Sequence, residues 1–103
     1  MKTFNTIEDL RKEYPYAVES IEIENKMQFI DARFITAGVG KDSGDDCIIA
    51  LFDVSLGCDS DGNTYSDDEV LVCLLCGDLQ EPLVDEYYVV PKDEAYKELA
   101  RLI

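Results

Sequence analysis

The sequence contains no histidine, and this absence removes several classes of chemistry. Catalysis by a histidine base, imidazole-ligated metal sites and histidine pH switches all need that side chain. The chain also lacks an apolar run of the roughly 18 residues that a transmembrane helix requires. Its N-terminus has no apolar stretch of signal-peptide length. We therefore expect a cytoplasmic protein with no membrane partner.

Basic residues are scarce throughout the chain. The sequence holds 23 Asp and Glu against 9 Lys and Arg, for a formal net charge of −14. Nucleic acid and anionic lipid are bound through cations that neutralise phosphate, so the composition argues against direct binding to either. Between Asp42 and Pro91 there is no Lys or Arg, whereas 13 acidic residues fall there. We call residues 42–91 the acidic segment and expect its charge to lie on hairpins and loops.

The length of 103 residues and the apolar share of 47% suit one modest hydrophobic core. We predict a single domain, residues 1–103, of the α+β class. Its antiparallel sheet is expected to have four to five strands in a meander-like order, with an N-terminal and a C-terminal helix.

Capping residues and periodicity locate the first elements. The pair Asn5-Thr6 offers helix caps, and Pro15 limits the helix that follows. Residues 20–24 alternate isoleucine with glutamate, which predicts a half-buried strand. A tight turn at Asn25-Lys26 would then lead into a strand from Met27 to about Thr36.

The acidic segment reads as strands separated by loops. Three glycines and three aspartates within residues 38–46 predict a loop, and residues 47–56 have the apolar content of a central strand. Residues 57–68 form a second acidic loop, followed by an apolar strand over 70–76. The remaining elements are expected to be a turn at 77–82, a strand at 83–90 and a helix that starts at Pro91 and Asp93.

The four cysteines, at positions 47, 58, 73 and 76, are expected to be free thiols in a reducing compartment. Cys73-Leu-Leu-Cys76-Gly77 satisfies the Cys-x-x-Cys-Gly pattern of a zinc knuckle. A second such pair is absent from the sequence, and strand residues three apart point to opposite faces of a sheet. We therefore favour cysteines packed in the core over a metal site, and predict no cofactor.

The loop at 57–68 resembles part of an EF-hand calcium loop. With Gly62 as the sixth position, Asp59, Asp61 and Asp68 fall on the third, fifth and twelfth. Position one is Gly57, which has no side-chain oxygen. We favour a hairpin connection in which Asp-Gly-Asn supplies positive-φ backbone, and keep calcium binding through residues 59–68 as an alternative.

Tyr87 and Tyr88 are adjacent in a predicted strand, so they should point to opposite faces. One ring is expected in the core. The other would be exposed beside acidic residues, where it suits contact with an arginine-rich partner.

Clustered carboxylates without basic neighbours favour a non-catalytic, protein-binding role. Carboxylates can occupy the places that duplex phosphates take on a basic groove, so the expected partner is a basic, nucleic-acid-binding protein. In composition and size the chain resembles the acidic anti-restriction and anti-CRISPR proteins of mobile elements, although the resemblance covers no definable stretch. It implies an inhibitor that acts as a DNA mimic. A structural subunit whose acids only confer solubility is a further alternative. The expected partner-binding residues are Asp42, Asp45, Asp46, Asp59, Asp61, Asp67, Asp68, Glu69, Asp85, Glu86 and Tyr88.

Overall fold

The computed structural model describes residues 2–42, 44–77 and 84–102. Their elements, in chain order, are β1 (Lys2–Phe4), α1 (Ile7–Glu13), α2 (Pro15–Gln28), β2 (Phe29–Ile30), β3 (Arg33–Asp42), β4 (Asp45–Asp53), β5 (Cys58–Asp59), β6 (Glu69–Cys76), β7 (Glu86–Pro91) and α3 (Lys92–Leu102).

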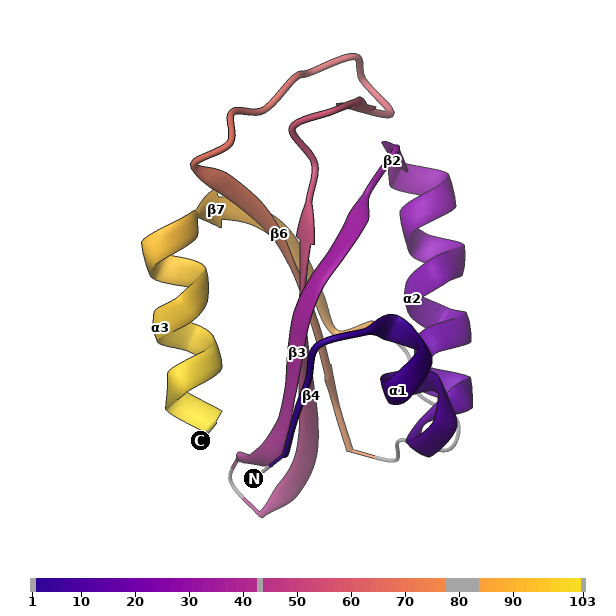
Figure 1. Ribbon diagram of the computed structural model, residues 1–103, viewed down its shortest axis with the longest axis vertical. Coiled ribbons are helices and arrows are strands. Elements are labelled where there is room, and N and C mark those ends of the chain that lie inside the picture. Colours follow the sequence, from indigo (N-terminus) through magenta and orange to yellow (C-terminus); the bar gives the residue numbers. More distant parts are fainter. Residues whose placement is uncertain (1, 43, 78–83, 103) are drawn as a thin grey trace.

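The main sheet has five strands in the order β1-β3-β4-β6-β7, and each adjacent pair is antiparallel. Strands β2 and β5 form a separate two-stranded sheet. Helices α1 and α2 cover one face of the main sheet and α3 covers the other (Figure 1). The structure therefore confirms the α+β class, the antiparallel sheet and the helices near both ends. Within the described residues, no helix is both long and apolar enough to cross a membrane.

Two buried clusters stabilise the sheet, one on each face. On the α1–α2 side, Phe52 and Leu71 pack with Leu10 and Ile21. On the opposite side, residues of β4 and β6 pack against Ala95, Leu99 and Leu102 of α3. Strand β4 is buried on both faces because its neighbours in the sheet and the two helical layers surround it. The prediction of a central strand here is confirmed.

The predicted strand at 20–24 is wrong, because these residues lie in the middle of α2. The predicted turn at Asn25-Lys26 and the start of the next predicted strand also belong to this helix. Pro15 begins α2, as its fixed φ and missing N–H allow at a first helical position. Ile21 is buried and Ile23 is exposed, although residues two apart on a strand would share one face. Ala17, Val18 and Ile21 are buried together, at the three- and four-residue spacing of one helix face.

The predicted loop at 38–46 is wrong as well. Residues 33–42 and 45–53 form a hairpin in which Asp42 pairs with Asp45. Gly38 and Gly40 lie within β3 because α3 packs closely against them. A Cβ at Gly38 would lie 2.6 Å from Leu99 Cδ1, and one at Gly40 would lie 2.2 Å from the Leu102 carbonyl oxygen. These two glycines therefore allow α3 to pack closely on the strand. The local sequence does not reveal this, because glycines are also typical of loops.

The other boundaries move by a few residues. Strand β4 ends at Asp53 instead of Leu56, and the short strand β5 lies inside the predicted loop at 57–68. Strands β6 and β7 and helix α3 match the predicted elements at 70–76, 83–90 and the C-terminus. The predicted turn at 77–82 lies outside the described residues, except for Gly77.

Two cysteines are not free thiols, which corrects the prediction for them. The β4–β6 register places Cys47 opposite Cys76 with their Cα atoms 4.1 Å apart, and the two form a disulfide. Cys58 and Cys73 are free. The pairing depends on which strands are neighbours and in what register, so spacing in the sequence gave no sign of it.

Candidate functional site

The acidic residues of the expected site divide into two groups. We call Asp45, Asp46, Asp85 and Glu86 the hairpin group, because they lie toward the β3–β4 turn. We call Asp59, Asp61, Asp67, Asp68 and Glu69 the loop group, because they lie between β5 and the start of β6. The groups lie toward opposite ends of the molecule (Figure 1), whose longest extent is 36 Å. The site residues thus do not form one continuous patch.

In the hairpin group, Asp45 and Asp46 are exposed at the first positions of β4. Lys41 Nζ lies 2.7 Å from Asp46 Oδ1, and this contact raises the pKa of Lys41. Asp42 pairs with Asp45 along the backbone, while its side chain lies outside the described residues. The backbone pairing of β3 and β4 therefore places Asp45 and Asp46, and Lys41 forms an ion pair with Asp46.

Asp85 and Glu86 belong to the hairpin group through strand β6. Asp85 Oδ2 accepts a hydrogen bond of 2.6 Å from the Cys76 backbone N–H. The Asp85 N–H donates to the Leu74 carbonyl at 2.8 Å, and Glu86 pairs with Leu74 in the register. The Asp85 carboxylate thus satisfies the backbone at the end of β6, and Glu86 is left exposed beside it.

Asp59 organises the loop group. Its Oδ1 accepts from the backbone N–H groups of Asp61, at 3.0 Å, and Asn63, at 2.8 Å. Its Oδ2 accepts from Asn63 Nδ2 at 3.1 Å and from the Tyr65 hydroxyl at 2.6 Å. The Tyr65 bond is the main cause of a lowered pKa for Asp59, and the same bond raises the pKa of Tyr65 to about 12. Gly62 has the predicted positive φ, of 84°.

The rest of the loop group is held by a second turn. Glu69 Oε1 accepts from the Ser66 N–H at 3.1 Å and from its hydroxyl at 3.3 Å. Ser66 Oγ in turn accepts from the Asp68 N–H at 3.3 Å. The side chains of Asp61, Asp67 and Asp68 are exposed around this frame. Carboxylates at Asp59 and Glu69 thus hold the loop, and the other three are presented to solvent.

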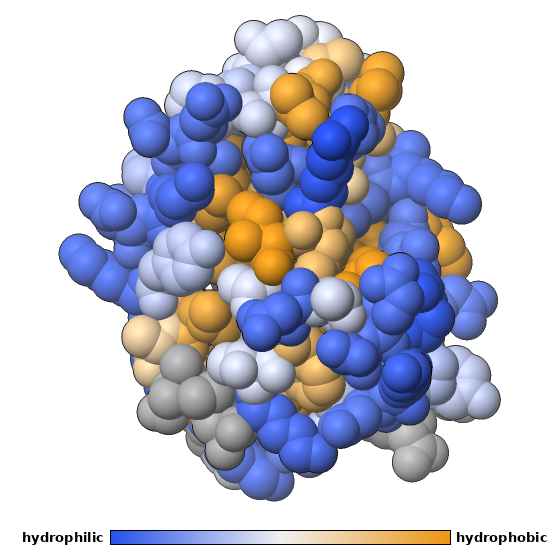
Figure 2. Space-filling view, viewed as in Figure 1, coloured by the Kyte–Doolittle hydropathy of each residue, from blue (hydrophilic) through white to orange (hydrophobic). Residues whose placement is uncertain are grey.

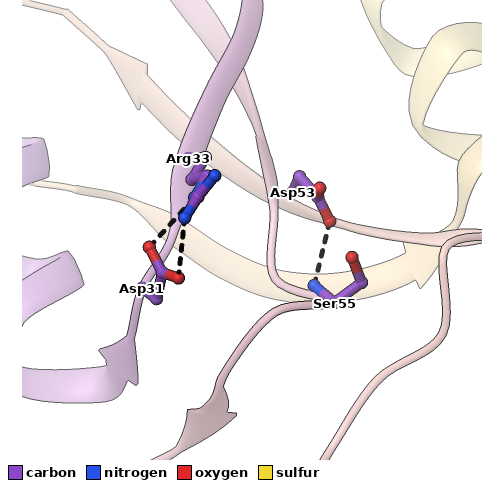
Figure 3. Close-up of polar contacts among 4 residues, drawn as sticks. All are labelled: Asp31, Arg33, Asp53 and Ser55. Atoms are coloured by element: carbon purple, nitrogen blue, oxygen red, sulfur yellow. Dashed lines mark hydrogen bonds and ion pairs between the residues drawn. The ribbon is translucent and has the colours of Figure 1, made fainter.

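Ion pairs rarely reach the acidic segment. The pairs at Glu13, Glu22, Asp31 and Glu98 all use acids outside it. Among described side chains, only Asp46 of the segment forms one. Figure 3 shows the contrast where the two regions meet: Arg33 binds Asp31 at 3.1 Å, while Asp53 accepts from the Ser55 N–H at 2.9 Å. That N–H bond is the main cause of a lowered pKa for Asp53, with smaller contributions from Lys92 and Arg33.

The two tyrosines point to opposite faces, as predicted. The Tyr87 hydroxyl donates a hydrogen bond to Asn25 Oδ1 of α2. Tyr88 is half-buried against the α3 side, where it lines a groove of about 300 Å³ with Val90, Glu94, Lys97 and Glu98. Burial raises the pKa of both hydroxyls. The expectation of an exposed ring is wrong, because Tyr88 is partly buried in the cluster beneath α3.

The zinc and calcium hypotheses can be compared with the positions of the cysteine and carboxylate side chains. Among the described residues, no group of three or more His, Cys, Asp or Glu side chains could hold a metal ion. Cys73 is buried on the α1–α2 face, while Cys76 is bonded to Cys47 on the α3 face. Both oxygens of Asp59 already accept hydrogen bonds from the loop. These contacts do not favour the calcium alternative over a structural role for Asp59.

No family model matches the chain, and neither a curated protein nor a solved structure is significantly similar to it.

The sequence analysis did not identify one surface feature, which lies away from the acidic residues. Tyr16, Ile23, Met27 and Ile30 are all more than half exposed along α2 and just beyond it. The spacing of seven residues between Tyr16, Ile23 and Ile30 indicates a common helix face, but Ile23 and Ile30 fell within the predicted strands at 20–24 and 27–36.

Proposed function

We propose that this chain is an acidic protein-binding module that docks on the nucleic-acid-binding surface of a basic partner protein. The observation that carries the proposal is a set of exposed carboxylates in the acidic segment that form no ion pair within the described residues. Asp45, Asp61, Asp67, Asp68 and Glu86 belong to this set. As an inhibitor, the chain would occupy the partner's surface in place of nucleic acid, as a DNA mimic of the anti-CRISPR or anti-restriction type does.

The spacing of the two groups determines the form of the proposed contact. Strand β4 is nine residues long, and at ~3.4 Å per residue it separates its ends by roughly 27 Å. A duplex presents charge continuously, at about one charge per 1.7 Å of its axis. Two separated acidic groups would instead engage two basic areas of a groove, with the less charged middle of the sheet between them.

The hydrogen bonds within both groups also support binding. Asp59, Glu69 and Asp85 accept backbone hydrogen bonds that fix the surrounding chain. A fixed set of charges loses less conformational entropy on binding than the same charges on a mobile chain. The structural carboxylates thus keep the exposed ones in position.

The test begins with immobilised protein and a panel of purified restriction and CRISPR nucleases at low salt. Any nuclease that binds is then titrated over a salt series, with and without a duplex DNA competitor. We expect affinity to fall steeply as salt rises, because the contacts are between charges. We also expect the duplex to displace the protein, because both would occupy one surface.

A matched pair of variants locates the contact. In the first, Asp45, Asp61, Asp67 and Asp68 are changed to Asn, which should weaken binding by at least about tenfold for a loss of roughly 1.4 kcal/mol. In the second, the helical acids Glu8, Asp9, Glu13 and Asp93 are changed to Gln or Asn, so that the net charge changes equally. The proposal fails if both sets weaken binding to the same degree, if salt has no effect, or if no nuclease binds.

A further inference from the structure

The outer face of α2 carries an exposed apolar stripe. Tyr16 is 58% exposed, Ile23 is 52% and Met27 is 64%, and Ile30, just beyond the helix, is 65%. We call these four residues the α2 stripe. Tyr16 and Ile23 lie two helical turns apart and share one face, because seven residues nearly complete two turns. The opposite face of α2 is buried against the sheet through Ala17, Val18 and Ile21.

Two opposite charges interrupt this stripe. Glu19 lies three residues after Tyr16, and Lys26 lies three residues after Ile23. Both side chains are exposed, and within the described residues neither forms an ion pair or a hydrogen bond. Apolar and charged positions therefore alternate along the outer face. The negative charge of Glu19 lies on one side of Ile23 and the positive charge of Lys26 on the other.

This arrangement is self-complementary when a second α2 lies antiparallel to the first. A two-fold axis beside Ile23 places the Tyr16 end of one helix against the Met27 end of the other, because the two helices run in opposite directions. The same axis brings Glu19 of each copy close to Lys26 of the other, four positions before and three after Ile23. Two-fold interfaces use the same patch on both subunits, which demands such complementarity.

The surface beside the stripe has room for a partner. A groove of about 390 Å³ runs along α2, lined by Arg11, Pro15, Glu19, Glu22, Ile23 and Lys26. Figure 2 shows apolar side chains at the surface near the upper end of α2. Charge also permits close approach here, because residues 1–41 contain seven acidic and six basic residues. The uncompensated charge that would drive two copies apart belongs to the acidic segment.

From these observations we propose that α2 is the interface of an antiparallel homodimer with two-fold symmetry. The occupant of the α2 stripe is the stripe of a second copy. Two ion pairs between Glu19 and Lys26 fix the orientation of the helices. The proposal does not depend on a nucleic-acid-binding partner, because the surface of the acidic segment is a separate one.

Analytical ultracentrifugation of the purified chain tests the assembly. In ~0.15 M salt, where the Debye length is about 8 Å, we expect a monomer–dimer equilibrium. Changing Ile23→Glu should weaken the dimer at least about 100-fold, because a charge would be buried at the axis. Tyr96→Glu is the matched control: Tyr96 is 41% exposed on α3, and its change should leave the equilibrium unaltered. Circular dichroism verifies that both variants fold.

A charge exchange tests the antiparallel geometry. Glu19→Lys and Lys26→Glu should each weaken the homodimer about tenfold, because each change places like charges opposite one another twice. Mixing the two single variants should restore dimers, since a heterodimer regains both ion pairs. The double variant should dimerise like the original chain.

Three results would overturn the proposal. The first is a chain that stays monomeric at millimolar concentration. The second is a dimer that Ile23→Glu leaves intact while the variant remains folded. The third is a pair of single charge variants that behave the same alone and mixed, which would indicate another surface or another orientation.

Discussion

The α1–α2 layer and the acidic segment satisfy their acidic side chains in different ways. In the helical layer, acids meet cations: Lys2 pairs with Glu13 and Arg11 with Glu22. In the acidic segment, carboxylates of Asp59, Glu69 and Asp85 accept hydrogen bonds from backbone N–H groups and hydroxyls. The first arrangement cancels charge, whereas the second fixes the chain and leaves the charge in place.

The acidic segment folds although it contains no Lys or Arg. Its strands β4 and β6 are almost wholly buried between the two helical layers. This segment is thus stabilised mainly by backbone pairing, apolar burial and one disulfide, whereas ion pairs are more frequent in the rest of the chain.

The disulfide should contribute most. Changing Cys47 and Cys76 to Ala together should lower the free energy of unfolding by about 2–4 kcal/mol, because the bond joins residues 29 apart in sequence and restricts the unfolded chain. Denaturant titration measures the loss. A thiol assay on the unfolded, unreduced chain should find only Cys58 and Cys73. Detection of all four thiols would show that Cys47 and Cys76 are not bonded.

The packing of α3 on β3 should come next. Gly40→Ala should lower stability by about 1–3 kcal/mol, because its new Cβ meets a backbone oxygen of Leu102. Gly38→Ala is the matched control and should cost less, because the Leu99 side chain that it meets can rotate. Thermal unfolding compares the two. Equal losses would mean that helix position is not set at Gly40.

Self-repulsion in the acidic segment should have a smaller effect of opposite sign. Replacing Asp61, Asp67 and Asp68 with Asn should raise stability by up to about 1 kcal/mol at low salt, since exposed substitutions each contribute within about 0.5 kcal/mol. The gain should shrink as salt screens the charges. Changing Glu13 and Glu22 to Gln should not raise stability, because these acids are paired. A gain of the same size there would remove the contrast between the two regions.

The Tyr65–Asp59 bond should give the smallest effect and a distinct pH profile. Tyr65→Phe should lower the melting temperature slightly, because one of several bonds that hold the loop is lost. The raised pKa of Tyr65 means that its contribution is complete below its usual value of 10.0 and disappears as pH rises toward about 12. The lowered pKa of Asp59 means that the contribution is also lost in acid, below the usual value for Asp. Melting curves across pH should therefore show the variant and the original chain converging at both extremes.

The sequence was most informative where one physical factor dominated. Continuous apolar content located β4 and β6, and the C-terminal periodicity located α3. It failed for residues 20–24, because isoleucine and glutamate alternate there as in a half-buried strand, whereas the helix buries Ile21 and exposes Ile23. It failed for Gly38 and Gly40 because glycine is needed both in loops and beneath a closely packed helix. For the candidate site, an antiparallel order of strands already implies that the loops at 42–46 and 57–68 lie at opposite ends of the sheet. The hydrogen bonds of Asp59, Glu69 and Asp85 could not be predicted, because they depend on the folded backbone around each carboxylate.

Two properties of this protein were determined by the amino-acid sequence alone: the excess of acids over bases, and their concentration in one segment. Neither depends on how the chain folds. Tertiary structure decided which carboxylates accept hydrogen bonds from the backbone and which remain exposed. It also decided that Cys47 faces Cys76 and that four apolar residues on and just beyond α2 point outward. These depend on strand register and helix placement, because contacts between residues distant in sequence form only when the whole sheet is assembled.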